Sequence, residues 1–225
     1  MATDAAGRIR RGSPTPFGPH RALGDGATPP AGQRHLVDGR VARGELTRRG
    51  LIEALVTLVD DGAEMPTSMQ AADLAGVSVR LVFHHFRGMD GLLLAAVSMQ
   101  SERHRDILFA IPSRGSSTLR IQALVRQRRL YFERIGPVYR AAYARPQPAA
   151  GLGDVLAHDR TLLRVQLSST LGPEIDTGRG PDDELLDALE QTTGWEAWRS
   201  LRDIRHLSAP SAERAMAFAA GRLVG

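Results

Sequence analysis

The residues of this chain best suited to chemistry lie in one short segment, residues 67–86. Small Ala72 is followed four residues later by Gly76, and then by apolar Val77 and Val82. This spacing suits a helix-turn-helix, because a small residue lets two helices approach, a glycine turns the corner and the valines pack inward. The second helix can then present its other side to the major groove of DNA. An ordinary pair of packed core helices is the alternative.

His84, His85 and His104 raise the question of a metal site. His84 and His85 are adjacent, so on a helix their side chains point about 100° apart and do not easily share one ion. The HExxH spacing does not occur and cysteine is absent. We therefore expect no metal site, with His85 contacting a phosphate or a base and His84 packing within the helices.

Hydrophobic periodicity predicts the helices that must position this segment. In the first half we expect helices over about 45–61, 67–74, 79–86 and 89–109. Thr67 and Gln70 have the spacing of a capping box. Val79–Phe86 could form a strand by composition, but a lone strand among helices would have no sheet to join. Later helices are expected over 119–135, 138–144, 155–171, 183–206 and 209–223, so the predicted fold class is all-α.

Composition excludes several function classes. All 29 Lys+Arg residues are arginine, which removes Walker-A ATPases, protein kinases, Schiff-base enzymes and pyridoxal enzymes, because each needs a lysine. No apolar run reaches the roughly 18–20 residues of a membrane span, and the N-terminus lacks the pattern of a signal peptide. Without cysteine there are no disulfides. We expect a cytoplasmic protein with no membrane partner.

Positive charge gathers at the N-terminal end. Residues 1–49 hold nine arginines against four acidic residues, a balance of +5, whereas the whole chain carries +4. Residues 1–42 are rich in Gly and Pro and show no hydrophobic periodicity. We predict a flexible basic tail that seeks polyanions. A solvated extension without function is the alternative.

Several short stretches surround the predicted helix-turn-helix: Arg43-Gly-Glu-Leu-Thr-Arg-Arg49, Ala75-Gly-Val-Ser78, Val82-Phe-His-His-Phe86 and Leu92-Leu93. Together they resemble the TetR (tetracycline repressor) family of transcriptional regulators, over about residues 43–100. The resemblance implies an N-terminal three-helix DNA-binding domain over 43–92. It also implies a helical ligand-binding and dimerisation domain over 93–225, and a homodimer that binds double-stranded DNA.

Carried over residue by residue, the resemblance implies a set of DNA-contacting residues: Arg48, Thr67, Ser78, Val79, Arg80, Leu81, Phe83 and His85. Thr67 would approach a phosphate. The chain departs from the family pattern at Leu81, Phe83 and Met89, which each lose a polar phosphate contact. Arg80 also departs from it, and can either hydrogen-bond a guanine bidentately or contact a phosphate. Arginines next to the predicted fold could restore affinity on the DNA backbone: Arg40, Arg43, Arg48 and Arg49.

The second half contains most of the aromatic residues. A pocket for an unidentified small-molecule effector is predicted there, with Arg128 as an anchor for an anion. Its candidate lining is Met99, Arg128, Tyr131, Tyr139, Tyr143 and Trp195. The alternative is that these residues belong to the core and the dimer contact. A four-helix subunit interface is predicted from Trp198, Leu201, Ala215 and Phe218. No cofactor is expected.

These observations favour a dimeric, sequence-specific DNA-binding regulator, most simply a ligand-responsive repressor acting on a near-palindromic operator. Two other classes stay open. One is a helical adaptor that binds protein instead of DNA, and it predicts that no DNA sequence is selected at moderate salt. The other is a helical enzyme whose site carries no recognised motif, since the chain lacks a Gly-x-Ser-x-Gly element and a complete GxGxxG.

Overall fold

The computed structural model describes residues 31–110, 115–145, 147, 149–178 and 180–225. The chain divides into two compact units, residues 1–41 and 42–225. Within the described residues all regular structure is helical, apart from an isolated bridge between Asp176 and Pro181. This confirms the predicted all-α class. None of the described helices is long and apolar enough to cross a membrane.

The first helix, α1 (Ala31–Asp60), begins well before the predicted start near residue 45. The predicted flexible tail over 1–42 is therefore wrong for 31–42, while residues 1–30 lie outside the described residues. The prolines of the N-terminal region stop at residue 30, so nothing in 31–42 removes a helical donor. The predicted apolar face is confirmed, since Leu51, Leu55 and Val59 are buried.

The next helices agree closely with prediction. They are α2 (Ser68–Leu74), α3 (Val79–Phe86) and α4 (Met89–His104), followed by the short α5 (Asp106–Phe109). The ambiguous segment 79–86 is thus a helix. The predicted helix over 89–109 divides at Arg105, whose backbone nevertheless stays in the helical region (φ −55°, ψ −32°).

One proline was expected to end a helix and does not. Helix α6 (Ser117–Tyr143) runs through Pro137, so the prediction of two helices separated at Gly136-Pro137 is wrong. Pro137 removes one backbone donor. Gly136 carries no Cβ to collide with the proline ring, and Ile135 and Val138 on either side are buried. Packing along the whole helix therefore outweighs the local break.

The remaining helices are α7 (Leu152–Ile175), α8 (Asp183–Thr193), α9 (Trp195–Arg199), a π-helical turn η1 (Ser200–Ile204) and α10 (Ala209–Val224). The predicted single helix over 183–206 is wrong, because Gly194 is extended and separates α8 from α9. A Cβ on Gly194 would lie 2.7 Å from the carbonyl oxygen of Glu190, so only glycine allows this turn. Helix α10 confirms the predicted final helix.

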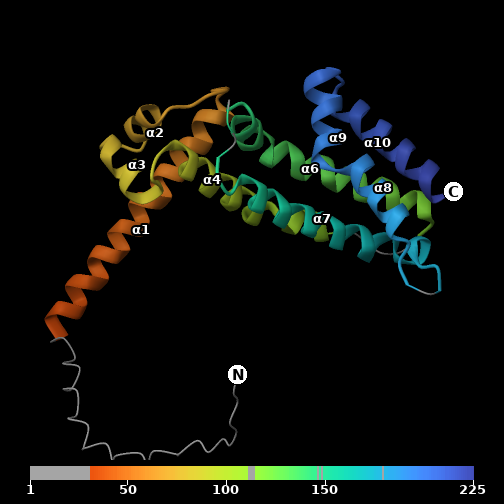
Figure 1. Ribbon diagram of the computed structural model, residues 1–225, viewed down its shortest axis with the longest axis horizontal. Helices are drawn as coiled ribbons and strands as arrows, with labels where there is room; N and C mark the ends of the chain where they lie inside the picture. Colours follow the sequence, from red (N-terminus) through yellow and green to blue (C-terminus); the bar gives the residue numbers. More distant parts are fainter. Residues whose placement is uncertain (1–30, 111–114, 146, 148, 179) are drawn as a thin grey trace, which may run out of the picture. The chain divides into compact units, whose positions relative to one another are not determined.

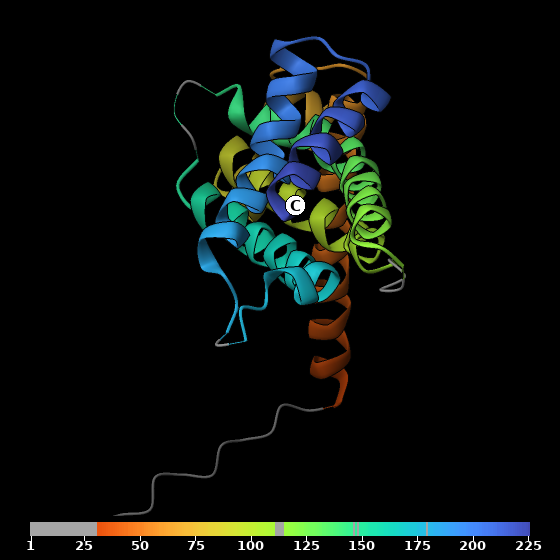
Figure 2. The same cartoon turned by 90° about the vertical axis from the view of Figure 1, so that its right-hand side faces the viewer.

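The helices of residues 42–225 form one bundle. Helix α4 packs against α6 and α7, α6 packs against α7 and α10, and α8 packs against α7 and α10. In Figure 1, α2 and α3 lie at one end of this unit and α8 and α10 at the other. Figure 2 shows the same bundle turned by 90°, in which α6 neighbours both α7 and α10.

Candidate nucleic-acid interface and ligand cavity

The start of α2 is fixed by side-chain hydrogen bonds. The Thr67 hydroxyl accepts from the Gln70 backbone N–H (3.2 Å), and the Gln70 side-chain oxygen accepts from the Thr67 backbone N–H (2.9 Å). The predicted capping box is therefore confirmed. Each bond satisfies a backbone donor that the helix itself leaves free. Thr67 stays exposed, so the cap also holds a polar group at the surface.

The turn between α2 and α3 has the geometry that its residues predict. Gly76 adopts a left-handed backbone (φ +67°), which glycine tolerates without a steric penalty. The Val77 N–H donates to the carbonyl of Ala72 (3.0 Å), closing the turn. Ala72 and Val82 are buried, and Val77 is half-buried. The helix-turn-helix geometry predicted from this spacing is thus present.

Helix α3 presents an exposed face opposite its buried residues. Arg80 is exposed, as are Val79 (41%) and Phe83 (57%), while Val82 and Phe86 are buried. Ser78 is exposed at the N-cap position of α3, and its hydroxyl makes no capping hydrogen bond. Among the other predicted contact residues, Leu81 packs partly against the core and His85 is half-buried.

The prediction that His84 packs within the helices is wrong, while the predicted DNA contact of His85 stays a prediction. His84 is exposed and lies one helical turn after Arg80, whereas His85 is half-buried. The His85 ring lies 3.9 Å from the position that a Cβ on Gly44 of α1 would occupy. Because α1 passes behind this edge of α3, His85 packs and His84 faces outward. No group of three or more His or acidic side chains among the described residues could hold a metal ion.

Arg48 of α1 is engaged within the protein. Its guanidinium lies 5.2 Å from the centre of the Phe86 ring, and the side chain is half-buried. This cation–π contact holds α1 against the end of α3. Of the arginines beside it, Arg43 is exposed, and Arg49 is an exposed partner of Glu53 (3.8 Å).

The junction between α3 and α4 leaves almost no steric freedom. Arg87 and Gly88 both adopt positive φ values (60° and 123°), and the Arg87 N–H donates to the Phe83 carbonyl (3.0 Å). A Cβ on Gly91 would lie 1.9 Å from the carbonyl oxygen of Phe86. The start of α4 therefore touches the end of α3 through backbone, which fixes the direction of the exposed face.

A cavity of about 210 Å³ lies in the second half, among α6, α7 and the junction of α8 with α9. Three predicted pocket residues line it: Tyr131, Tyr139 and Trp195. The lining residues that the sequence analysis missed include Phe132 and three carboxylates, Asp159, Glu190 and Glu196. Three of the predicted pocket residues thus line one cavity, together with carboxylates that were not predicted, and its use by an effector stays a prediction.

Asp159 is the centre of a buried polar cluster. Its Oδ2 accepts a hydrogen bond from Ser101 Oγ of α4 (2.6 Å) and another from the Tyr139 hydroxyl of α6. Burial raises the pKa of Asp159 to about 6. The sequence did contain a signal, because Asp159 lies four residues after Val155 and four before Leu163 on the apolar face of α7.

The predicted role of Arg128 as an anion anchor is wrong. Arg128 is fully buried, and its nitrogens donate to protein acceptors: Gln166 Oε1 (2.9 Å), both oxygens of Thr193 (3.1 and 2.6 Å) and the Leu163 carbonyl (2.6 Å). Burial lowers the pKa of its guanidinium. Four of its five N–H donors are already used within the protein, so Arg128 connects α6, α7 and α8, and it does not line the cavity.

Two other predicted pocket residues lie elsewhere. Met99 is half-buried on α4 and lines a separate hollow against α1. Tyr143 lies beneath Arg199, whose guanidinium carbon is 5.3 Å from the ring centre. Neither residue lines the aromatic cavity, because Met99 lies beside α1 and Tyr143 lies against Arg199 of α9.

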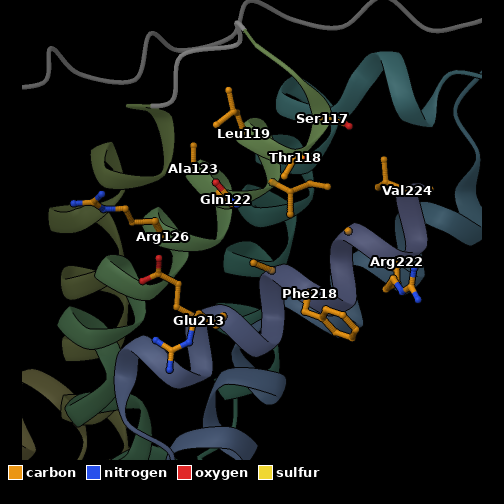
Figure 3. Close-up of a pocket in the computed structure, with 15 residues that line it drawn as sticks. Ser117, Thr118, Leu119, Gln122, Ala123, Arg126, Glu213, Phe218, Arg222 and Val224 are labelled. Atoms are coloured by element: carbon orange, nitrogen blue, oxygen red, sulfur yellow. The ribbon is translucent and has the colours of Figure 1, made fainter.

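The predicted subunit-contact residues are divided between surface and interior. Trp198 is only 1% exposed and packs on Phe132, so it belongs to the core of its own chain and is not a surface contact. Leu201 and Ala215 are half-buried, and Phe218 is 70% exposed. Phe218 and Arg222 of α10 and Leu119 of α6 line an open hollow of about 810 Å³ (Figure 3).

No protein-family model matches the chain. It is similar to the HTH-type transcriptional regulator BetI of Escherichia coli O45:K1 (strain S88 / ExPEC), with 38% identity over 85 residues, or 36% of this chain and 43% of that protein. BetI of strain K12 / DH10B is 36% identical over 85 residues. The chain thus spans less than half the length of these relatives.

Among solved structures, a tetR-family transcriptional regulator from Streptomyces coelicolor has a TM-score of 0.61 at 20% identity. The match covers 80% of this chain and 87% of that one. This likeness shows that the two chains share a fold.

Proposed function

We propose that the chain is a TetR-family protein that regulates transcription as a DNA-binding homodimer. Its similarity to BetI over 85 residues and the fold that it shares with a tetR-family regulator support this proposal. Two copies of α3 would enter successive major grooves of a near-palindromic operator, with half-sites about 34–36 Å apart or somewhat more. The family is non-enzymatic, which sets the enzyme alternative aside. We further propose that the protein is a repressor; a cytoplasmic location stays a prediction.

The exposed face of α3 is the observation that carries this proposal. Arg80 and Phe83 are free on a helix whose opposite side, Val82 and Phe86, is buried. The Gly76 turn, closed by the bond from the Val77 N–H to the Ala72 carbonyl, precedes the helix, and the backbone contact at Gly91 fixes its other end. A major groove about 12 Å wide admits an α-helix. A rigid helix with a free arginine therefore suits base recognition.

Individual roles follow from exposure. Arg80 is proposed to contact a guanine or a phosphate, and Thr67 to approach a phosphate. The structure adds His84 as a candidate, because it shares the exposed side of α3 with Arg80. Leu81 and His85 would contribute mainly through packing, since both are half-buried. The proposed DNA-binding part remains 43–92 and the proposed regulatory part 93–225.

Dimerisation is proposed through α8 and α10. Phe218 is a large apolar side chain left 70% exposed, which is costly unless another surface covers it. Ala215 and Ala219 are half-buried on the same helix and would allow a second α10 to approach closely. The neighbouring hollow beside α6 could accept Phe218 of a second copy. This arrangement would give a four-helix contact between subunits.

Regulation is proposed to act through the aromatic cavity. An effector bound there would favour a subunit geometry in which the two α3 helices no longer match the half-site spacing. A coupling free energy of about 1–3 kcal/mol between the two sites would suffice. The hydrogen bond from Ser101 of α4 to Asp159 connects the cavity to the helix that follows α3.

Selection of DNA from a random fragment pool by the purified full chain tests the proposal. Recovery of a palindrome at both low and moderate salt is the expected result. Arg80→Ala should relax specificity at one position if Arg80 contacts a base, or weaken all sequences evenly if it contacts a phosphate. Arg134→Ala, an exposed arginine of α6 that lines neither the aromatic cavity nor the hollow beside α10, is the matched control. Unrelated fragments recovered only at low salt would contradict sequence-specific binding and favour the adaptor.

A further inference from the structure

The sulfur atoms of this chain all belong to methionine, and two of those methionines are exposed. The sequence contains six methionines and no cysteine. Met65 is 55% exposed and Met69 is 65% exposed, whereas Met216 is 1% exposed. Met89 and Met99 are half-buried. Among the described methionines, Met65 and Met69 are therefore the side chains that an oxidant in water reaches most readily.

These two methionines lie on either side of the proposed phosphate contact. Met65 precedes Thr67 by two residues, and Met69 follows it by two residues in the first turn of α2. We propose that oxidation of Met65 and Met69 to methionine sulfoxide lowers the affinity of the protein for DNA, which makes DNA binding sensitive to peroxides. This inference rests on the proposed function, because it requires the start of α2 to lie beside the DNA backbone.

The fold does not depend on these exposed side chains. Their neighbours Pro66, Ala71 and Ala72 are buried and supply the packing at this end of α2. The start of the helix is fixed by the capping hydrogen bonds between Thr67 and Gln70, to which no methionine contributes. Oxidation disrupts a core when the methionine is part of that core. We therefore expect oxidation here to change DNA binding and not the stability of the fold.

The reaction transfers one oxygen atom to sulfur. A lone pair of the thioether sulfur attacks one oxygen of hydrogen peroxide, and the O–O bond breaks. The hydroxide that leaves takes the proton from the sulfur-bound oxygen and becomes water. The sulfur is oxidised by two electrons and the peroxide is reduced by two. A methionine sulfoxide reductase, supplied with electrons by a thiol, removes the oxygen again, so the change is reversible.

A sulfoxide opposes a neighbouring phosphate through its hydrogen-bonding pattern. The new oxygen accepts hydrogen bonds and donates none, and the oxygens of a DNA phosphate also only accept. Two acceptors brought together lose water without gaining a hydrogen bond, which costs free energy. Residues 61–78 contain no arginine or histidine, so this segment offers the new oxygens no charged donor. A thioether sulfur, by contrast, is only a weak acceptor.

Treatment of the purified full chain with hydrogen peroxide tests the inference. Peptide mass spectrometry locates the added oxygen atoms, fluorescence anisotropy of a labelled duplex measures DNA affinity, and thermal unfolding measures stability. We expect Met65 and Met69 to be oxidised before Met216, DNA affinity to fall about tenfold, and Tm to stay unchanged. Methionine sulfoxide reductase with dithiothreitol should restore the affinity. Unchanged affinity when both methionines are oxidised would overturn the inference.

A double variant, Met65→Leu with Met69→Leu, removes both exposed sulfur atoms at similar side-chain volume. Its DNA affinity after peroxide treatment should equal its own affinity before treatment. Met99→Leu, half-buried on α4, is the control and should lose affinity as the wild type does. If the double variant lost as much affinity on treatment as the wild type, the role of the pair would be overturned. Reversal by the reductase in the wild type decides without any variant.

The two proposals can fail separately. The affinity measurements use the duplex recovered by selection or, if none is recovered, a duplex of arbitrary sequence at low salt, because phosphate contacts do not depend on sequence. A selected palindrome that oxidised and reduced protein bind equally would reject the oxidation effect alone. Peroxide-sensitive binding of an arbitrary duplex without a selected sequence would reject the operator and leave the role of the methionines standing. A wild-type chain that binds no duplex at low salt would overturn both.

Discussion

The helix-turn-helix and the aromatic cavity place their functional side chains in opposite ways. On α3, Arg80 and Phe83 are exposed, and the fold does not depend on them. Around the cavity, Asp159 is buried, and so is the neighbouring Arg128. A surface site can therefore change its sequence at little cost to stability, whereas a buried polar group must keep its partners.

The two regions also differ in how far apart their contacts lie along the chain. The capping box joins Thr67 to Gln70, and the turn joins Ala72 to Val77. In the second half, Ser101 pairs with Asp159, 58 residues away, and Arg128 with Thr193, 65 residues away. The first region is held by local bonds and the second by long-range ones. Four substitutions test this contrast.

Arg128→Met should have the largest effect. It removes four hydrogen bonds and takes the charged donor away from buried oxygens of Gln166, Leu163 and Thr193, so we expect a loss of about 3–5 kcal/mol in unfolding free energy. Urea denaturation measures it. The control, Arg126→Met, is exposed on the same helix and should stay within about 0.5 kcal/mol of wild type. A similar stability for both variants would show that the buried bonds only balance the cost of desolvation.

Asp159→Asn should change how stability depends on pH. Burial raises the pKa of Asp159 from 3.8 to about 6, so the folded state holds this proton more tightly than the unfolded chain. Its stabilising contribution is complete below about pH 4 and is lost as the pH rises through about 6. The shift corresponds to about 3 kcal/mol.

The asparagine variant lacks this titration, so its stability relative to wild type should increase by up to about 3 kcal/mol between about pH 4 and pH 7. Thermal or urea unfolding across that range measures the difference. The titratable side chains beside Asp159 are Tyr131 and Tyr139, and phenols ordinarily ionise near pH 10. Parallel stability curves for the two proteins would contradict a buried charge at this position.

Gly91→Ala tests the rigidity of the helix-turn-helix. The new Cβ would meet the Phe86 carbonyl oxygen at 1.9 Å, so α3 or α4 must shift, at an expected cost of about 1–3 kcal/mol. DNA affinity should fall as well, because the direction of α3 changes. Gly50→Ala on α1 has nothing within 4 Å and should instead stabilise by about 0.5–1 kcal/mol. If Gly91→Ala stabilises the protein as Gly50→Ala does, the junction between α3 and α4 can move to accommodate the new Cβ and is not rigid.

Thr67→Ala should have the smallest effect on stability. It removes the side-chain half of the capping box at α2, worth about 1 kcal/mol. Thr67→Ser keeps the hydroxyl and should restore most of the stability. If Thr67→Ser restores both stability and DNA affinity, the hydroxyl contributes to both properties. If Thr67→Ala instead lowers DNA affinity and leaves stability unchanged, the hydroxyl contributes only to the contact with a phosphate.

The sequence alone determined the helix-turn-helix and the helical character of the chain. Capping, turn geometry and the apolar faces of helices depend on residues three to five positions apart, which can be seen in the sequence itself. This is why α2, α3 and α10 were predicted nearly to the residue. Exposure of Arg80 and Phe83 followed from the same periodicity.

The tertiary structure alone decided what surrounds each side chain. The passage of α6 through Pro137, the exposure of His84 and the interior position of Trp198 all depend on helices distant in sequence. Asp159 was visible as an acid on an apolar face, but its partners, Ser101 and Tyr139, come from two other helices. The physical reason is that packing a helix against several neighbours can outweigh its local preferences, and no spacing along one helix reveals those neighbours.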